Sequence, residues 1–529
     1  MESWRAHLNP EYFSPEKKDF YRFFPYRDVN AIREKKQTAW NVAKPGPELD
    51  ILFILLIALL VLSVQSALAV GSYSGAGDPP MYGDFEAQRH WMEITYHLPP
   101  REWYVNSTDN DLLYWGLDYP PLTAYHSYLM GLVADQINSS WVALKSSRGL
   151  EALHHKFFMR LTAILPFHVI YAPAILYFVF YQTKTKELSS NTVFALILAY
   201  PGLLAIDNAH FQYNSVSLGL FLVSFLFLVN QRFLLGSLAF VMALNYKQME
   251  LYHALPVFTF ILARCLKRPL RSHIVESTVA LLKVSSVVCM AFVLLWIPFI
   301  LSGPQTVLAV LGRIFPFYRG LYEDKVANVW CAFSFVLRMN KHFSLETQVR
   351  ISAICVIFVT LPSLFLLFLR PTLKNFKLSL MISSLAFFLF SFQVHEKSVL
   401  LAAIPALLLL PEHHRAVVWF LHISNTSMFP LCLKDGTGLL LALFIAYYIS
   451  CSVVTKFSGK LLLALYHLSC LIAVTLCVME WTITPPQRYP HIFPLLNAMY
   501  SCVHFLGFLG YFYVEMAHSE YRVWLEKRA

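Results

Sequence analysis

The sequence predicts an all-α protein that crosses a membrane many times. Of its 529 residues, 57% are hydrophobic and only 14% are charged, a balance outside the range of ordinary soluble domains. Long apolar runs recur along the chain, and a bilayer core about 30 Å thick needs roughly 20 apolar residues for one helical crossing. The first run, residues 51–70, follows a long polar and aromatic segment, so we interpret it as a transmembrane helix rather than a cleaved signal peptide.

The apolar runs, taken in order, predict about 14 transmembrane helices. The third, fifth, ninth and tenth runs are short, and we expect tilted or broken helices there that their neighbours shield from lipid. The predicted crossings are residues 51–70, 157–181, 192–206, 215–231, 233–246, 252–266, 276–301, 351–369, 378–392, 398–411, 415–433, 439–455, 461–481 and 491–515.

The charged loops between these crossings indicate the orientation of the chain. With the N-terminus in the cytosol, the loops predicted to be cytosolic are basic, whereas residues 71–156 on the opposite, lumenal face contain ten acidic residues and five Lys or Arg. This asymmetry follows the positive-inside rule and places the C-terminus in the cytosol as well. Two glycosylation sequons, at Asn106 and Asn138, fall in the same lumenal loop. The basic loops are QTKTK (182–186), RCLKRPLRSH (264–273), RPTLKNFK (370–377) and KFSGK (456–460).

The chain is therefore expected to have one large domain with short ends. Residues 1–50, in which YRFFPYRDVNAIREKKQTAW alternates basic and aromatic side chains, are predicted to lie at the cytosolic interface as an anchor. Residues 51–515 form the predicted transmembrane domain, with large lumenal loops at 71–156 and 302–350. Residues 516–529 are predicted to form a cytosolic tail.

Composition also argues against several function classes. The nine cysteines contain no CxxC pair and no metal-ligand spacing, and most lie inside apolar runs, so we predict neither a disulfide framework nor a metal site. The net charge of +10 is spread over short clusters instead of one patch, which argues against nucleic-acid binding.

The polar stretches that could carry chemistry all fall on the predicted lumenal face. They are GDFEAQRHW (83–91), DNAHFQYNS (207–215), NYKQMEL (245–251), RIFPFYRGLYEDKVANVWC (313–331) and FQVHEKS (392–398). Aromatic faces suit sugar rings, cations suit phosphate, and a carboxylate near a hydroxyl suits a general base. Together they are compatible with glycosyl transfer from a lipid phosphate sugar held at a membrane surface.

The stretch GDFEAQRHW supplies the candidate base, Asp84, which would take the proton of an acceptor hydroxyl. The structural alternative for Asp84 is a helix N-cap. Glu86 is either a supporting partner of that base or a solvated surface charge. Arg89 and His90 are either phosphate or sugar contacts or partners of the neighbouring acids in salt bridges.

The stretch FQVHEKS interrupts an apolar region with three ionisable side chains, which are costly at such depth unless they are paired or used. We assign function here, with His395 and Lys397 facing a leaving phosphate and Glu396 beside them. Lys247 is a similar candidate, although Glu250 stands at a helical spacing that would let the two residues pair.

Two further segments carry candidates with open alternatives. In GLDYPPLTAYH (116–126), the Pro-Pro pair predicts a rigid corner that seats the loop on the membrane, and Asp118 is a possible supporting residue. The stretch 313–331 is predicted to be a lumenal re-entrant or surface loop, and Arg319 within it is either a substrate contact or part of a solvated charged loop.

At these residues the sequence resembles a known family. The segments GDFEAQRHWMEIT, YWGLDYPPLTAYH, HFQYNSVSLGL, IFPFYRGLYEDKVANVWC and VHEKSVL closely resemble the endoplasmic reticulum glucosyltransferases that use dolichyl-phosphate glucose. Within that family the chain resembles the α-1,3-glucosyltransferases that add the first glucose to the nine-mannose lipid-linked oligosaccharide. Members that add the second glucose have DFEVHRNW and FQFNG where this chain has DFEAQRHW and FQYNS, and they are kept as the alternative.

The resemblance implies a multi-spanning C-type glycosyltransferase fold in the endoplasmic reticulum membrane, acting in N-glycan precursor assembly. It implies an inverting transfer without metal or other cofactor, from dolichyl-phosphate glucose to a dolichyl-diphosphate-linked oligosaccharide. The family's base carries over to Asp84, and its VHEK motif, associated with the donor phosphate, carries over to His395, Glu396 and Lys397. Lys247 and Arg319 are expected to help neutralise the phosphate.

A transporter of a small polar solute is the competing class, because such proteins also combine many crossings with broken helices around polar residues. The sequence argues against it in two ways. No internal repeat is apparent in which two halves are interrupted alike, and the ionisable groups cluster on one face instead of near the midplane.

Overall fold

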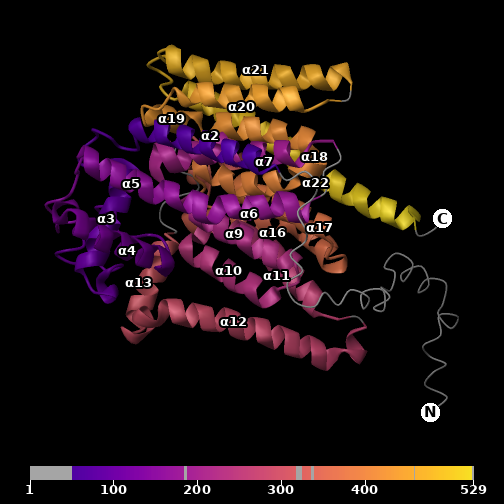
Figure 1. Ribbon diagram of the computed structural model, residues 1–529, viewed down its shortest axis with the longest axis horizontal. Helices are drawn as coiled ribbons and strands as arrows, with labels where there is room; N and C mark the ends of the chain where they lie inside the picture. The colour runs from indigo at the N-terminus through magenta and orange to yellow at the C-terminus, as the bar shows by residue number, and fades with distance from the viewer. Residues whose placement is uncertain are drawn as a thin grey trace.

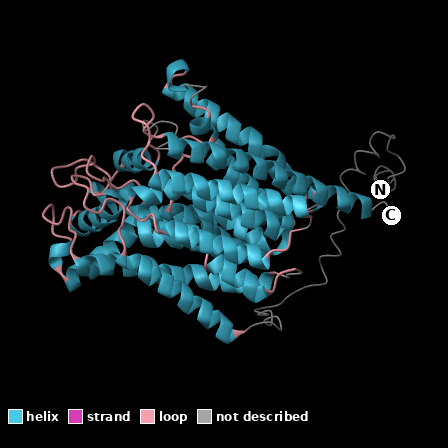
Figure 2. Ribbon diagram, turned by 90° about the horizontal axis from the view of Figure 1, so that it is seen from above, coloured by secondary structure: helices cyan, strands magenta, loops and turns pink. Residues whose placement is uncertain are grey.

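The computed structural model describes residues 50–183, 187–267, 269–316, 325–334, 339–457 and 459–526, and every regular element in this part of the chain is a helix. Most helices lie side by side along one direction (Figure 1). The connecting loops gather mainly at one end of the bundle, which we call the loop end (Figure 2). The predicted anchor, residues 1–49, lies outside the described residues.

Nine helices of the described part are long and apolar enough to cross a membrane, and three shorter apolar helices accompany them. The long segments are α2 (Ile51–Val70), α5 to η7 (Leu153–Gln182), α7 to η8 (Ser190–Phe211), α12 (Ile274–Leu301), α16 (Leu345–Leu369), α17 (Leu373–Phe390), the segment Glu396–Lys434, α21 (Lys460–Thr482) and α22 (Ile492–Glu526), of which Ile492–His518 is the apolar part. The shorter ones are α9 (Asn214–Val229), α10 (Phe233–Tyr246) and α20 (Leu440–Val454).

The segment Glu396–Lys434 folds back on itself. It contains η11 (Glu396–Val399), α18 (Leu400–Ser427) and α19 (Phe429–Lys434), and a straight helix of this length would extend about 58 Å. Its two ends nevertheless meet, because Lys397 and Asp435 both lie against His210. The backbone leaves helical geometry at His413, with φ −126° and ψ 36°, and this kink is the turn between two passes.

The helices therefore make as many passes as the sequence predicts. With α18 counted as two passes and α11 (Leu251–Cys265) added to the three shorter helices, the described residues make 14 passes through the bundle. The runs 398–411 and 415–433, predicted as two crossings, are the two arms of this helical hairpin. The multi-pass, all-helical architecture predicted from the apolar runs is confirmed.

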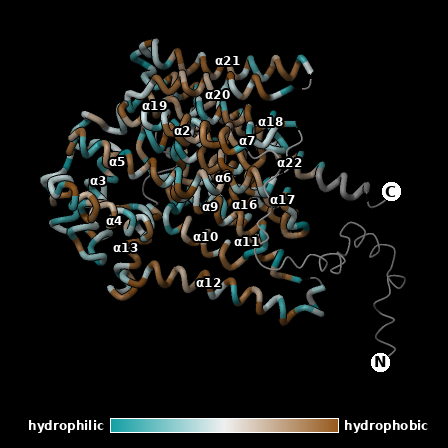
Figure 3. The backbone as a smooth tube through the Cα atoms, in the orientation of Figure 1, coloured by the Kyte–Doolittle hydropathy of each residue, from teal (hydrophilic) through white to brown (hydrophobic). Residues whose placement is uncertain are grey.

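Helices differ in how deeply they are buried, and the outer ones carry apolar surfaces. In the most hydrophobic stretches of α17 and of Glu396–Lys434, 78% of the residues are buried. In those of α2 and α12 only 11% are buried. On α12, for example, the side chains of Leu282 and Leu294 are 61% and 60% exposed. Apolar residues line these helices, and polar ones concentrate toward the ends (Figure 3). Such a surface suits contact with lipid.

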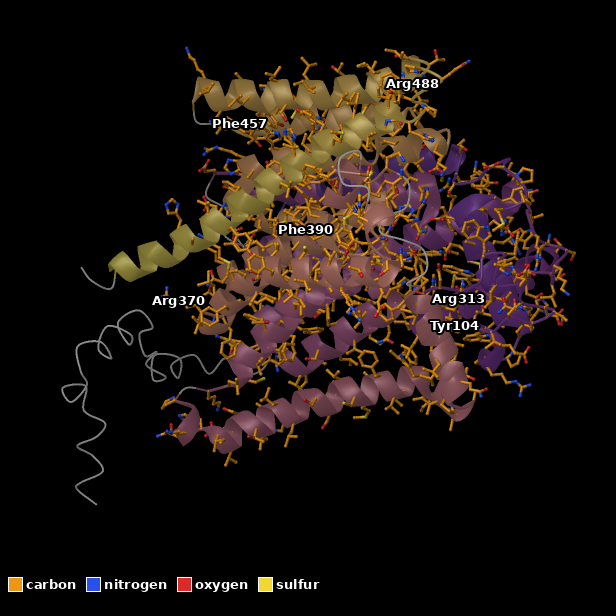
Figure 4. The ribbon with its side chains drawn as sticks, turned by 180° about the vertical axis from the view of Figure 1, so that it is seen from behind. Tyr104, Arg313, Arg370, Phe390, Phe457 and Arg488 are labelled. Atoms are coloured by element: carbon orange, nitrogen blue, oxygen red, sulfur yellow. The ribbon has the colours of Figure 1, made fainter. Side chains whose placement is uncertain are left out.

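Loops predicted to share a face meet in space. At the end opposite the loop end, Arg415 donates to the carbonyl of Lys456 at 2.6 Å and pairs with Glu187 at 3.0 Å. Figure 4 shows Arg370 and Phe457 toward this end, and Tyr104, Arg313 and Arg488 at the loop end. The alternation of the passes thus separates the two sets of loops as the sequence predicts.

Short helices build the loop end. Helix α3 (Gly83–His97) packs against α4 (Pro121–Ile137), where a Cβ on Gly131 would lie 2.8 Å from the carbonyl oxygen of Met92. Pro121 is the first residue of α4, so the Pro-Pro pair begins a helix at this corner. The remaining short helices are η4 (Pro100–Glu102), η5 (Ser139–Trp141), η9 (Gln248–Glu250), α13 (Pro304–Ile314), α14 (Val329–Ala332) and α15 (Met339–His342), and η10 (Leu270–Ser272) lies at the other end.

Candidate active site

A cavity of about 960 Å³ opens at the loop end of the bundle. Its lining draws on segments far apart in the sequence, and it combines acids, cations and aromatic rings. The ionisable and aromatic lining residues include Asp84, Trp91, Trp115, Asp118, Tyr119, His210, Lys247, Arg313, His395, Lys397, Lys434 and Asp435. A space of this size is in the range of sites for small organic ligands.

Asp84 lies in the first turn of α3, and a close approach of two backbone segments holds it there. Gly75 and Gly83 both have positive φ, of 76° and 66°, and a Cβ on Gly75 would lie 2.0 Å from the carbonyl carbon of Tyr82. Only glycine allows this contact. The backbone N–H of Asp84 then donates to the hydroxyl oxygen of Ser74, with 3.2 Å between nitrogen and oxygen. The N-cap of α3 is Tyr82, so Asp84 is not the cap.

The carboxylate of Asp84 faces the cavity and is held through one oxygen. Its Oδ2 accepts hydrogen bonds from Gln212 at 2.6 Å and from Lys397, and lies 3.0 Å from Nε2 of His210. Burial by itself raises the pKa of Asp84, but the charge of Lys397 and the hydrogen bond with His210 outweigh burial and hold that pKa well below its usual range. The side chain is 22% exposed, so an ionised carboxylate is accessible from the cavity.

His210 stands between two carboxylates. Its Nδ1 lies 2.6 Å from Oδ2 of Asp435, which follows α19, and its Nε2 faces Asp84. Neither His210 nor Asp435 is among the candidate residues that the sequence indicates. The stretch DNAHFQYNS contains His210, but nothing in the sequence connects it with an aspartate 225 residues away.

Lys247 is connected to Asp84 through the side-chain amide of Gln212. Its ammonium donates to Oε1 of Gln212 at 2.9 Å and to Oδ1 of Asn214 at 2.7 Å, and it lies 4.9 Å from the centre of the Tyr119 ring. Burial and the nearby charge of Lys397 lower the pKa of Lys247 to about 8. Gln212 therefore joins Lys247 to Asp84.

The expected alternative partner of Lys247 is occupied elsewhere. Glu250 lies 2.6 Å from Nδ1 of His253, whose Nε2 lies 2.8 Å from the carbonyl oxygen of Leu401. The helical spacing of Lys247 and Glu250 therefore does not produce a salt bridge between them, and the Lys247 ammonium remains at the cavity wall.

The VHEK segment reaches the cavity from the start of η11. His395 is the N-cap of this turn, and its Nδ1 lies 2.7 Å from Oε2 of Glu396. His395 and Lys397 line the cavity, whereas Glu396 is buried behind them with its side chain 4% exposed. The arrangement places an imidazole and an ammonium on the same wall as Asp84.

The remaining acids and bases of GDFEAQRHW turn away from the cavity. Arg89 donates to both carboxylate oxygens of Glu86, at 2.6 and 2.7 Å, and to Glu93 at 2.7 Å, while Nδ1 of His90 lies 3.3 Å from Glu93. All four are buried, and none lines the cavity. Burial raises the pKa of Glu93, but His90 and Arg89 together lower it to about 2. Glu86, Arg89 and His90 therefore form an internal network within residues 71–156, which we call the loop domain.

The two remaining candidates, Asp118 and Arg319, have different outcomes. Asp118 lines the cavity, and its carbonyl oxygen accepts a hydrogen bond from Gln248 at 3.2 Å. Arg319 lies outside the described residues. Arg313, at the end of α13, also lines the cavity and donates to the carbonyl oxygens of Leu117 and Gly116 (Figure 4).

Taken together, the cavity wall offers in Asp84 a partly exposed carboxylate that is in contact with Lys397 and His210. A carboxylate held ionised can accept a proton from a hydroxyl, and nearby ammonium groups can stabilise a departing phosphate. Within the described ranges, no group of three His, Cys, Asp or Glu side chains is arranged to hold a metal ion.

Comparison with known proteins points in the same direction. The model of the ALG6, ALG8 glycosyltransferase family matches residues 53–511. A relative from Caenorhabditis elegans, described as a probable dolichyl pyrophosphate Man9GlcNAc2 alpha-1,3-glucosyltransferase, is 50% identical over 92% of this chain and 93% of its own length. The Gallus gallus protein of the same description, without "probable", is 45% identical over 86% and 95%, and a probable one from Arabidopsis thaliana is 39% identical over 90% and 91%.

Proposed function

The chain belongs to the ALG6, ALG8 glycosyltransferase family, and we propose that it transfers glucose in α-1,3 linkage to dolichyl pyrophosphate Man9GlcNAc2. The relatives' names specify this acceptor, which carries no glucose, and therefore favour the first-glucose enzyme over the sister that adds the second. The donor is dolichyl-phosphate glucose. Its lipid tail would lie among the apolar outer helices and its phosphate in the cavity.

One observation carries the mechanism: Asp84 and Lys397 share the same cavity wall in direct contact. Asp84 accepts the proton of the mannose 3-hydroxyl as that oxygen attacks the anomeric carbon of glucose. The bond from that carbon to the phosphate oxygen breaks on the opposite side, so a β-linked donor gives an α-linked product. The released dolichyl phosphate takes the bonding electron pair as negative charge.

The basic side chains of the wall stabilise this developing charge. Lys397 and His395 come from the VHEK segment and line the cavity beside Asp84, and Lys247 reaches it from the turn after α10. A positioned cation is most effective in a site with little water, where charges are poorly screened. Asp118 and Arg313 line the same cavity.

The orientation of the chain follows from its charges. The loop end carries the acidic first loop and the cavity, and the opposite end carries the basic loops. By the positive-inside rule the basic end is cytosolic, with both termini, and the cavity faces the lumen of the endoplasmic reticulum. The acceptor glycan and the donor head group would then meet on the lumenal surface.

Reconstitution tests the function directly. Purified protein in liposomes is incubated with synthetic dolichyl-phosphate glucose and the Man9GlcNAc2 lipid, and the product linkage is determined by mass spectrometry and α-glucosidase digestion. One α-1,3-linked glucose is expected, with no transfer from dolichyl-phosphate mannose. Transfer only to an acceptor that already has one glucose would identify the sister activity, and solute flux without transfer would identify a transporter.

A further inference from the structure

His210 makes contacts that the reaction, as described so far, does not use. One ring nitrogen faces Asp84 at 3.0 Å and the other faces Asp435 at 2.6 Å. An imidazole that donates to both carboxylates carries a proton on each nitrogen. Nζ of Lys397 also lies 3.3 Å from Nε2, so the ammonium and the imidazole meet at the same carboxylate. The ring is thereby fixed in one orientation with an N–H directed at Asp84.

The surroundings of His210 are rigid. Its backbone carbonyl accepts a hydrogen bond from the N–H of Ser74 at 3.1 Å, and Ser74 in turn accepts from the Asp84 backbone. Arg160 donates to the carbonyl oxygens of Ser72 and Ala209 at 2.8 and 3.0 Å, which ties the two segments together from behind. The backbone that carries the base and the backbone that carries the imidazole are thus one unit.

Asp435, which also lines the cavity, contacts His210 through its carboxylate. It is 7% exposed and follows α19, the short helix that ends the second arm of the α18 hairpin. Its backbone N–H donates to the carbonyl of Leu431 at 3.2 Å, so the end of α19 holds it in place. The fold therefore brings an acid from the chain's last third against a histidine from its middle.

We propose that His210 and Asp435 are a positioning pair for the catalytic base. Asp435 fixes the imidazole, and the imidazole fixes Oδ2 of Asp84, so that Oδ1, which no side chain of the described ranges bonds, is directed to the acceptor hydroxyl. This role rests on the proposed function of Asp84.

The pair matters most when the donor is bound. Lys397 also holds Oδ2, but its ammonium lies at the cavity wall and is attracted to the donor phosphate. Once Lys397 turns to the phosphate, His210 and Gln212 are the contacts that still orient the carboxylate. Misplacement of a reacting group by about 1 Å can cost about 10²-fold in rate, so contacts that keep the Asp84 carboxylate in place support the reaction.

The test compares Asp435→Ala and Asp435→Asn in reconstituted protein, with donor dissociation constant, thermal stability and kcat measured separately. Asp435→Ala is expected to lower kcat by about 10- to 100-fold with donor binding unchanged within about twofold. Asp435→Asn keeps a hydrogen-bond partner for the ring and is expected to recover part of kcat. Glu187→Gln, which alters an acid facing His414 at the opposite end, is the matched control and is expected to behave as wild type.

A double-mutant cycle with Asp84→Asn separates this role from a structural one. If Asp435 acts through Asp84, Asp435→Ala has no further effect on residual turnover in the Asp84→Asn background. An equal loss in both backgrounds, or weakened donor binding and stability in Asp435→Ala, would overturn the proposal while leaving Asp84 as the base. Full activity of Asp84→Asn would instead overturn the mechanism on which the pair depends.

Discussion

The Nζ atom of Lys397 donates a hydrogen bond to Oδ2 of Asp84 across 313 residues of sequence. The contact joins the first turn of α3 to the start of the α18 hairpin, and both side chains are partly open to the cavity, at 22% and 16% exposure. A carboxylate and an ammonium in contact neutralise each other until a ligand separates them. The donor phosphate is such a ligand, because it competes for the ammonium and leaves the carboxylate ready for a proton.

Replacing Lys397 should therefore impair reaction of the donor. Lys397→Met removes the positive charge that would stabilise the leaving phosphate. Loss of one such group typically costs about 10²- to 10³-fold in rate. Lys397→Arg keeps the charge and should retain more activity. The measurement is kcat/KM for dolichyl-phosphate glucose, with Lys145→Met as the control for removal of an exposed lysine of the same loop domain. Equal activity of Lys397→Met and wild type would contradict the assigned role.

The reaction should weaken in alkali because of Lys247. Its pKa of about 8 means that the ammonium is charged below this pH and becomes neutral as the pH rises through it. At pH 9 about nine tenths of these side chains are neutral, so the KM for the donor should rise by up to about tenfold. Lys247→Arg remains charged and should give a flat profile over this range. A wild-type KM that is constant from pH 7 to 9.5 would argue against contact with the phosphate.

Arg89 should matter for stability and not for chemistry. Arg89→Met leaves the buried carboxylates of Glu86 and Glu93 without their cation, and breaking a buried ion pair in this way typically costs about 3–5 kcal/mol. The expected result is a lower melting temperature in detergent, with kcat per folded molecule unchanged within about threefold. An unchanged melting temperature together with a raised donor KM would show that Arg89 contacts substrate.

The sequon at Asn106 should carry a glycan if the loop end is lumenal. Asn106 is exposed, and it lies in the same loop domain as the base. Digestion with peptide N-glycosidase should reduce the apparent mass of wild type by more than that of Thr108→Ala, which keeps only the second lumenal sequon at Asn138. The control Leu270→Asn creates the triplet Asn-Arg-Ser in a basic loop at the other end. Glycosylation of that variant at its new sequon would contradict the orientation.

The fold was largely predictable because apolar length is a local property. Runs of about 20 apolar residues have few alternatives to a membrane helix. Even for the runs 398–411 and 415–433, which the structure joins in one kinked element, the sequence alone predicts two passes. What the sequence did not contain is which helices are central, since that depends on packing between distant segments, as in the burial of α17 and α18.

The site was predictable where a single segment carries it. Asp84, His395 and Lys397 were expected at the cavity and lie there. Helical periodicity separates the residues of GDFEAQRHW into two faces of α3. Asp84, Gln88 and Trp91 share the face toward the cavity, and Arg89 with its partners lies on another face. Arg89 stands three residues after Glu86 and four before Glu93, which is the helical spacing of salt bridges, so pairing with acids is one of its two interpretations from sequence.

The contacts between segments could not be predicted. His210 and Asp435 are 225 residues apart, and neither has a local pattern that indicates an imidazole between two acids. Gln212 reads as one polar residue in a short motif, yet its amide joins Asp84 to Lys247. Such links arise from the tertiary fold, in which the ends of several helices converge on one cavity.

The account depends most on Asp84, and single-turnover kinetics of Asp84→Asn with synthetic donor and acceptor test it most directly. The variant keeps the shape of the side chain but cannot accept the hydroxyl proton. It should bind donor at least as tightly as wild type, because Lys397 no longer pairs with a carboxylate, and react about 10²- to 10⁴-fold more slowly. Asp109→Asn, an exposed neighbour paired with Lys145, should react at the wild-type rate. Turnover of Asp84→Asn within a few-fold of wild type would contradict the central claim.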